Sequence, residues 1–278
     1  MLLAAAMSSA DADPAAVRRG AYLAAAAGCD QCHTDSKNGG QPYAGGRIIE
    51  SEAGDIAAPN ITPDKATGIG GWSAADFARA MRWGIAPDGT HYVPAFPFPY
   101  FAGLTDGDLA DLKAFLDSIA PVSRSVPGAS SLGLAGRARA ALGVAVAGAA
   151  VAPPAPAGDA AATRGAYLVA TVGHCGDCHT PLTLLGAPDL DRYLAGSRGG
   201  LEGRKAPDIT ADPDNGIGKW HADDIASLLK DGMTPDNDFV GGAMAEIVRN
   251  TARLTDDDRR AIAAYLLSLT PKQLVRNN

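Results

Sequence analysis

Two short segments hold every cysteine of this 278-residue chain, and in both of them a histidine follows the second cysteine. The members of the two CxxCH segments are Cys29, Cys32 and His33, then Cys175, Cys178 and His179. Residues three apart lie on one face of a helix, so the two thiols of a segment can each bond to one vinyl group of the same porphyrin. The histidine that follows can give its imidazole to the iron as proximal ligand. The spacing therefore predicts two covalently attached haem c groups.

Three other uses of paired cysteines fit the sequence less well. A structural zinc site joins two CxxC pairs that are typically about 12–20 residues apart, whereas these pairs lie in opposite halves of the chain. A thioredoxin-like dithiol needs a βαβ setting, and no strong strand pattern flanks either pair. Local disulfides stay open as an alternative, but they would not require the two histidines.

The chain is an internal duplication, which places each CxxCH segment in its own repeat. The offset between the copies of a motif stays within 145 to 150 residues. The recurring motifs are RGAYL at 19–23 and 164–168, an AP(N/D)IT segment at 58–62 and 206–210, GIG at 68–70 and 216–218 followed by Trp72 and Trp220, and LTD at 104–106 and 254–256. We therefore expect two homologous domains, residues 13–122 and 159–278, with one haem each.

Each repeat should begin with a helix that leads into its CxxCH segment, from about Pro14 in the first repeat and about Asp159 in the second. Gly20 and Gly165 lie within these helices, where the missing side chain allows a second helix to approach closely. Alanine and glycine are abundant and runs of β-branched residues are few. We therefore predict an all-α fold with long loops.

Two further helices are predicted in each repeat. A middle helix should begin at Ser73, because Asp76 three residues later completes a capping-box pattern, and its copy should begin near His221. A last helix should occupy residues 105–121 and 255–271, each closed by a proline. The last helices carry apolar residues at helical spacing, which is typical of a buried core.

The segment between the repeats, residues 123–158, is predicted to be a linker. Its alanine-rich run, residues 140–151, is interrupted by glycines and followed by a proline-rich stretch that stiffens the chain. The run is shorter than the roughly 20 apolar residues that cross a bilayer, so we expect no transmembrane segment. Residues 1–12 combine an apolar stretch with an Ala-Asp-Ala cleavage pattern, which predicts the remnant of a signal peptide.

The net charge of −7 argues against nucleic acid as a partner, because the sequence has no basic stripe to neutralise phosphates. Haem c is attached outside the cytoplasm, and the signal-peptide pattern points the same way. We therefore expect the protein in the periplasm. Any association with the inner membrane would be made through a partner.

With these motifs the chain resembles class I cytochrome c domains in tandem. The likeness is greatest to the dihaem cytochrome c proteins associated with periplasmic and membrane-bound alcohol, aldehyde and sugar dehydrogenases. It covers nearly the whole chain except the linker, and CxxCH is its most specific motif. The resemblance implies an electron carrier of a respiratory chain rather than an enzyme. A dehydrogenase would be its electron donor, and another cytochrome or a terminal oxidase would be its acceptor.

In such domains a methionine downstream of the haem histidine usually ligates the opposite face of the iron. In the second repeat the resemblance assigns this role to Met244, which lies 65 residues after His179. A thioether ligand raises the haem potential and suits electron transfer. The alternative for Met244 is a core residue. Met233 is the rival methionine, but it aligns with Ile85, on the wrong side of the turn.

In the first repeat the pattern fails, because Phe96 stands at the methionine position and has no lone pair to give to iron. Met81 lies in a predicted helix opposite Leu229, where a core role is expected. His91 lies opposite Phe239 and could ligate the iron, form a hydrogen bond near the haem edge or face solvent. The sixth ligand of haem 1 is therefore His91, Met81 or no residue at all.

An open haem 1 defines an alternative function. It could bind a small ligand or reduce peroxide, with haem 2 supplying electrons. The sequence favours this reading less than electron transfer, because no distal acid–base pair is evident around Phe96.

The remaining candidates near the haem groups are aromatic and basic. Trp72 and Trp220 could donate indole N–H groups to haem propionates, with a buried aromatic role as the equal alternative. Arg47 could pair with a propionate, although a solvated surface arginine is the more common case. His174 and His221 are expected to be exposed.

Overall fold

The computed structural model describes residues 13–50, 55–92, 95–126, 151, 154, 160–183, 187–198 and 205–269. In the first repeat the elements are α1 (Pro14–Ala26), α2 (Cys29–His33), η1 (Ser36–Asn38), β1 (Ile48–Ile49), β2 (Ile56–Ala57), α3 (Ala74–Trp83), α4 (Phe98–Phe101) and α5 (Asp106–Ser118). In the second they are α7 (Ala160–Tyr167), η2 (Leu168–Val172), α8 (Gly176–His179), η3 (Leu190–Arg192), β3 (Ala195–Ser197), β4 (Ala206–Asp208), α9 (Ala222–Asp231), α10 (Gly242–Thr251) and α11 (Asp256–Ser268). The predicted signal-peptide remnant and most of the predicted linker lie outside the described residues.

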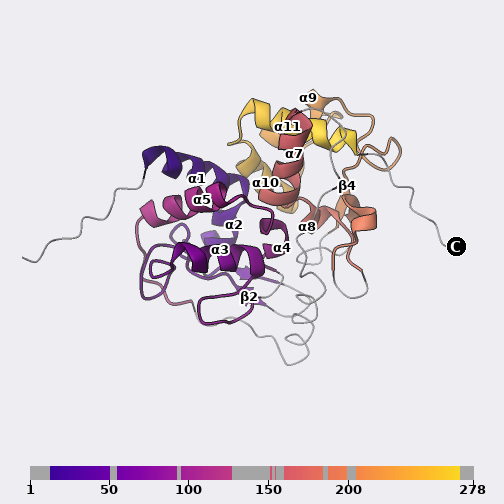
Figure 1. Cartoon of the computed structure of the whole chain (residues 1–278). Helices are drawn as coiled ribbons and strands as arrows, with labels where there is room; N and C mark the ends of the chain where they lie inside the picture. Colours follow the sequence, from indigo (N-terminus) through magenta and orange to yellow (C-terminus); the bar gives the residue numbers. More distant parts are fainter. Residues whose placement is uncertain are drawn as a thin grey trace, which may run out of the picture.

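Apart from η2, which follows the first helix of the second repeat only, the two repeats carry their elements in the same order. Helices dominate both of them, as predicted (Figure 1). The sequence did not predict the strands. In each repeat two short strands form an antiparallel pair, β1 with β2 and β3 with β4. Strand β2 leads into the first AP(N/D)IT segment and β4 forms the first three residues of the second, so each pair fixes where its segment lies relative to the CxxCH helix.

The first helix of each repeat packs closely on the last helix, as the glycines predicted. Figure 1 shows α1 beside α5 and α7 beside α11. A Cβ atom added to Gly20 would lie 1.9 Å from the carbonyl oxygen of Asp111, and one added to Gly165 would lie 1.9 Å from that of Ala261. Both distances are too short for non-bonded atoms, so only glycine fits at either crossing.

The predicted helix starts are confirmed by their caps. Ser73 and Asp76 form a reciprocal capping box at the start of α3. The hydroxyls of Thr105 and Thr255 accept hydrogen bonds from the backbone N–H groups three residues later, at 3.0 and 3.1 Å. The predicted ends were slightly late, because α5 ends at Ser118, three residues before Pro121. The residue before a proline is biased away from the helical conformation, which accounts for an early end.

One continuous buried cluster draws its apolar side chains from both repeats. Helix α4 of the first repeat contacts η2 of the second, where Leu168, Val169 and Val172 are almost completely buried. Tyr100 and Phe101 of α4 belong to the same cluster. The repeats therefore share a hydrophobic core, in addition to the core that each last helix builds within its own repeat.

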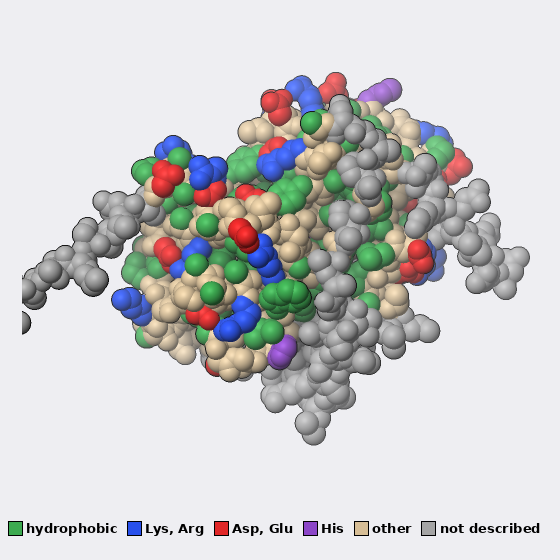
Figure 2. Space-filling model, viewed as in Figure 1, with side chains coloured by type: hydrophobic (Ala, Val, Ile, Leu, Met, Phe, Trp, Pro, Cys, Tyr) green, Lys and Arg blue, Asp and Glu red, His purple; other side chains and the backbone are tan. Residues whose placement is uncertain are grey.

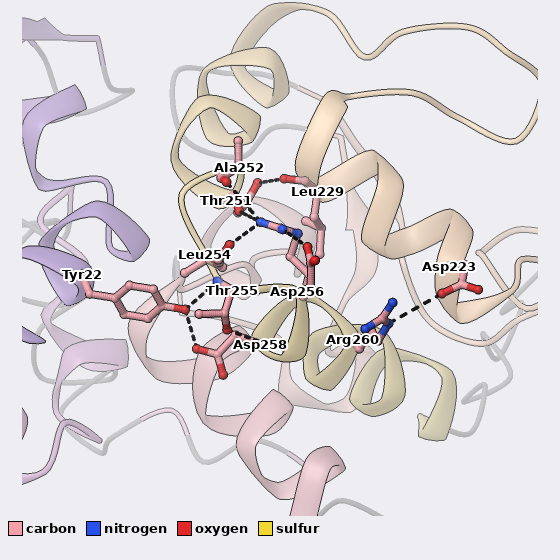
Figure 3. Close-up of polar contacts among 11 residues, drawn as sticks. Tyr22, Asp223, Leu229, Thr251, Ala252, Leu254, Thr255, Asp256, Asp258 and Arg260 are labelled. Atoms are coloured by element: carbon pink, nitrogen blue, oxygen red, sulfur yellow. Dashed lines mark hydrogen bonds and ion pairs between the residues drawn. The ribbon is translucent and has the colours of Figure 1, made fainter.

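Two equivalent tyrosines connect the repeats reciprocally. The hydroxyl of Tyr22 donates to Asp258 at 2.6 Å and accepts from the backbone N–H of Thr255 at 3.1 Å, so it lies at the start of α11 (Figure 3). Its copy, Tyr167, donates to Asp108 at the start of α5. Each repeat thus contributes one phenol to the first turn of the other repeat's last helix.

No helix in the described part of the chain is long and apolar enough to cross a bilayer. On the face drawn in Figure 2, basic and acidic side chains are interspersed among the described residues rather than gathered into a basic stripe.

Candidate functional site

The two CxxCH histidines have the same hydrogen-bonded geometry. Nδ1 of His33 lies 2.8 Å from the carbonyl oxygen of Pro59, and Nδ1 of His179 lies 2.8 Å from that of Pro207. A carbonyl oxygen only accepts hydrogen bonds, so each Nδ1 must carry the hydrogen, and each Nε2 keeps a free lone pair. This is the arrangement in which a carbonyl partner orients a metal-ligating imidazole.

The electrostatic setting favours the neutral form of these imidazoles. Burial lowers the pKa of His33 and of His179, and the hydrogen bond to the proline carbonyl opposes this shift only in part. A neutral imidazole is the form that can donate its lone pair to iron.

The recurring loop motifs build the turn that holds each proline carbonyl in place. Backbone N–H groups of Ile69 and Ile217, the central residues of the two GIG motifs, donate to the carbonyls of Thr62 and Thr210 at 2.9 Å. A Cβ atom on Gly68 would lie 2.2 Å from the Thr62 carbonyl oxygen, so the turn can close only on glycine. The AP(N/D)IT and GIG motifs therefore belong to one structure, which positions the partner of the histidine.

The four cysteines lie in partly exposed positions, and none of them forms a disulfide. Burial of the sulfur atoms raises the pKa of Cys29 to about 12 and that of Cys175 to about 11. A reactive dithiol needs a thiolate, and the raised pKa of these two thiols disfavours that alternative. Among the described residues, no group of three or more Cys, His, Asp or Glu side chains could hold a metal ion.

Met244 lies in the first turn of α10, half-buried and packed against the core. Two contacts fix this helix at its other end. The hydroxyl of Thr251 donates to the Leu229 carbonyl at 2.5 Å, and the buried guanidinium of Arg259 donates to the carbonyls of Thr251 and Ala252 at 3.0 and 3.1 Å (Figure 3). The helix that carries the candidate thioether is thus firmly placed.

The backbone confirms how the distal loops of the repeats align. Met233 pairs with Phe239 across an isolated antiparallel bridge, and Ile85 pairs with His91 in the same way. Met233 is 37 % exposed. Met81 is buried in the core at 7 % exposure, as predicted for a core residue.

The residues around Phe96 form an aromatic series. Its half-buried ring lies 5.8 Å from the ring of Tyr92 and 5.7 Å from that of Phe101. His91 is exposed to solvent. The ring of Phe96, which the sequence alignment sets opposite Met244, thus lies among other aromatic rings, and the candidate imidazole of His91 is exposed.

His174 is not exposed, contrary to the sequence prediction. Its Nε2 lies 3.3 Å from the carbonyl oxygen of Ala27, and its ring lies edge-on to Phe101 at 5.3 Å. His174 precedes Cys175, and Ala27 lies two residues before Cys29, so this contact brings the two CxxCH segments together. His174 has a φ of +37° and Gly28, its counterpart, a φ of +64°. His174 therefore replaces a glycine at a position of positive φ, and the sequence prediction overlooked this unusual replacement as a sign that His174 has a structural role.

Sequence reasoning also missed the contribution of the second repeat to the first site. The side-chain amide of Gln31, which lies between Cys29 and Cys32, donates to the backbone carbonyl of Glu246 in α10. Arg47, predicted as a solvated side chain, donates to the Gln31 carbonyl at 2.7 Å and lies 3.5 Å from the Glu246 carboxylate. The two contacts with Glu246 cross between repeats, and no periodicity within one repeat could indicate them.

Trp72 and Trp220 are half-buried and pack against the core. Neither indole N–H has a hydrogen-bond partner within the residues that the structure describes. Both the packing role and the donor role therefore remain compatible with their positions.

Comparison with known proteins completes the description of the site. The profile of the cytochrome c family matches residues 17–120 and 162–270. A protein of Cereibacter sphaeroides named diheme cytochrome c-type is 42 % identical over 89 % of this chain and 84 % of its own length. The gluconate 2-dehydrogenase cytochrome c subunit of Pantoea cypripedii is 38 % identical over 96 % of this chain. The cytochrome c subunit of the quinone alcohol dehydrogenase of Gluconobacter oxydans is 38 % identical over 93 %. The chain spans only 63 % and 56 % of these two subunits.

Proposed function

The chain belongs to the cytochrome c family, and from this premise we propose that it binds two covalently attached haem c groups, one in each repeat. The residues proposed to bind them are Cys29, Cys32 and His33 for haem 1, and Cys175, Cys178, His179 and Met244 for haem 2. Haem iron supplies reversible one-electron redox chemistry. The protein supplies attachment, axial ligation and a dry, apolar setting.

The paired geometry of His33 and His179 carries this proposal. In both repeats Nδ1 donates to a proline carbonyl at 2.8 Å, which turns a bare Nε2 away from the loop. Two such sites, each next to a CxxC pair that forms no disulfide, match the needs of haem c better than those of zinc.

The function that fits these sites is transfer of single electrons from a dehydrogenase to a downstream cytochrome or terminal oxidase in the periplasm. Support for the donor comes from the relatives named as dehydrogenase cytochrome subunits. The compartment rests on the signal-peptide pattern and on the place where haem c is attached. The proposed domains are residues 13–122 and 159–278, and support for two of them comes from the two regions that the family profile matches, 17–120 and 162–270.

Trp72 and Trp220 are proposed as propionate donors, because their indole N–H groups are otherwise unused among the described residues. Ligation of haem 1 by His91 has less support, because this imidazole lies on the exposed side of its loop. Peroxide reduction at haem 1 is likewise not favoured, since the half-buried Phe96 offers no proton donor there.

The test is the haem content of the full chain after denaturation. Mass spectrometry should find two haem groups per chain, and a redox titration should find two one-electron steps. Replacing both Cys29 and Cys32 by Ala should remove one haem and leave the other attached. A single haem in the wild type, or zinc in the native protein, would overturn the proposal.

A further inference from the structure

The loop before α10 carries an exposed apolar pair in the second repeat. Met233 is 37 % exposed and Phe239 is 64 % exposed, and they face each other across an antiparallel bridge. Between them the backbone N–H of Thr234 donates to the Asp238 carbonyl at 2.8 Å, and Asn237 turns the chain with a φ of +59°. We call residues 233–239 the outer hairpin of the second repeat.

The first repeat has the same hairpin with different side chains. Residues 85–91 close through a hydrogen bond from the Ala86 N–H to the Thr90 carbonyl at 2.8 Å, and Ile85 pairs with His91. Here the pair is a half-buried isoleucine and an exposed histidine. The shared backbone therefore serves the fold, and the apolar pair is particular to the second repeat.

Three acidic side chains lie next to this pair along the chain, with Lys230 as the one basic neighbour. Asp231, Asp236 and Asp238 are all exposed and lie in or next to the outer hairpin. The first hairpin has a single acid, Asp88, in the corresponding stretch. Complementary charge around an apolar centre is the pattern that steers and seats a protein partner.

The hairpin leads directly into the proposed haem 2 site. The Val240 N–H donates to the Gly232 carbonyl at 2.9 Å and closes the base of the hairpin, and Met244 follows in the first turn of α10. A protein seated on the hairpin would therefore approach the thioether side of haem 2.

We propose that the outer hairpin of the second repeat is the docking surface for a redox protein whose contact face has an apolar centre ringed by lysine and arginine. This inference rests on the proposed function, and it assigns the exchange of electrons with that partner to haem 2. A second copy of the chain fits less well, because two acidic hairpins would repel each other across a two-fold axis. An anionic membrane surface would be repelled by the same acids.

The test compares two oxidants of the reduced full-length holoprotein in stopped-flow measurements. One is a lysine-rich monohaem cytochrome c, and the other is hexacyanoferrate(III), which needs no docking surface. Met233→Ser combined with Phe239→Ser should slow the protein oxidant about tenfold at low salt and leave the small oxidant unchanged. The matched control is Trp83→Ser, which removes an exposed aromatic ring (57 % exposed) from α3 of the first repeat and should change neither rate.

A second pair of variants tests the charges. Asp236→Asn with Asp238→Asn should flatten the decline of the protein rate with ionic strength. An unchanged protein rate in the apolar variant overturns docking at the hairpin, and so does equal slowing of both oxidants. Dimerisation of the wild type that the apolar variant abolishes, with the protein rate unchanged, would assign the hairpin to a second copy instead. A wild type that reduces neither oxidant would contradict the electron-transfer function itself.

Discussion

The side-chain amide of Gln31 donates a hydrogen bond to the backbone carbonyl of Glu246, two residues after Met244. Gln31 stands between the two cysteines proposed to hold haem 1, and Met244 is the proposed ligand of haem 2. The attachment segment of one haem is therefore bonded to the helix that carries the distal ligand of the other. A displacement of the first attachment segment can therefore shift α10 through this hydrogen bond.

Gln31→Ala should therefore change haem 2 as well as haem 1. A net hydrogen bond is worth about 1 kcal/mol, which for one electron corresponds to at most about 40 mV. We expect a shift of up to this size in the midpoint potential of haem 2, measured by redox titration. The control is Gln41→Ala, an exposed glutamine outside both sites. If Gln31→Ala moves only the first haem, the contact does not couple the sites.

Met244→Ala tests the distal ligand directly. Loss of the thioether should lower the potential of haem 2, open a coordination position to carbon monoxide and remove the near-infrared sulfur-to-iron absorption band. Met233→Ala is the matched control, because this exposed methionine lies in the same repeat. The band should survive in the control. Its survival in Met244→Ala would show that another residue is the ligand.

The helix crossings at the two glycines should tolerate no side chain. In Gly165→Ala the new Cβ would lie 1.9 Å from the Ala261 carbonyl, so α7 would have to move away from α11. Overpacking of this kind costs about 1–3 kcal/mol or more of unfolding free energy, measured by urea denaturation. Gly107→Ala in α5 has no neighbour closer than 3.9 Å and should be neutral or slightly stabilising. Equal effects of the two substitutions would contradict this packing.

The contact between Tyr22 and Asp258 should make stability depend on pH. Partial burial opposes ionisation, but hydrogen bonds from Arg164 and Tyr22 outweigh it and hold the pKa of Asp258 below its usual value. A carboxyl whose pKa is lower in the folded state contributes stability above its unfolded pKa and loses it as the pH falls through the folded value. Tyr22→Phe should therefore destabilise the chain by about 1.5–3 kcal/mol at pH 7 and by less in strong acid.

Urea denaturation at both pH values measures this difference. Tyr92→Phe serves as the control, because within the described residues its half-buried hydroxyl makes no hydrogen bond. A Tyr22→Phe effect that is the same at pH 7 and in acid would show that the ionised carboxylate is not the partner.

The sequence predicted what lies within one repeat and missed what lies between repeats. Helix starts at Ser73 and Thr105, and the close crossing at Gly20, follow from short-range spacing and were confirmed. The half-buried position of His174 and the contact from Gln31 to α10 depend on how the two repeats meet. Side-chain periodicity reports only which face of an element is buried, so it could not identify the partner on that face.

The strands were missed for a different reason. Strands β1 and β2, which pair Ile48 with Ala57, are only two residues long, and a loop separates them. So short a segment carries no alternation that a pattern could detect. The hydrogen bonds from His33 and His179 to proline carbonyls could not be predicted from the sequence either. The recurring AP(N/D)IT motif did mark the segment that provides the carbonyl.

The last prediction is that the two haem groups differ in kind. The matching bridges of Ile85 with His91 and Met233 with Phe239 align the two hairpins, and the same offset carried five residues further puts Phe96 where Met244 stands. An iron without a thioether should have a lower potential than a His/Met neighbour. Haem 1 should then be high-spin and five-coordinate beneath Phe96, and its reduced form should bind carbon monoxide.

Electron paramagnetic resonance of the oxidised protein decides among the ligands. His91→Ala should leave the high-spin signal of haem 1 unchanged, because His91 lies on the exposed side of its hairpin. A change of spin state on this substitution would instead make His91 the ligand. Phe96→Met should convert haem 1 to a low-spin His/Met centre with a raised potential and a second sulfur-to-iron band. Two His/Met signals in the wild type would defeat the prediction, since the buried Met81 would then have to leave the core to ligate haem 1.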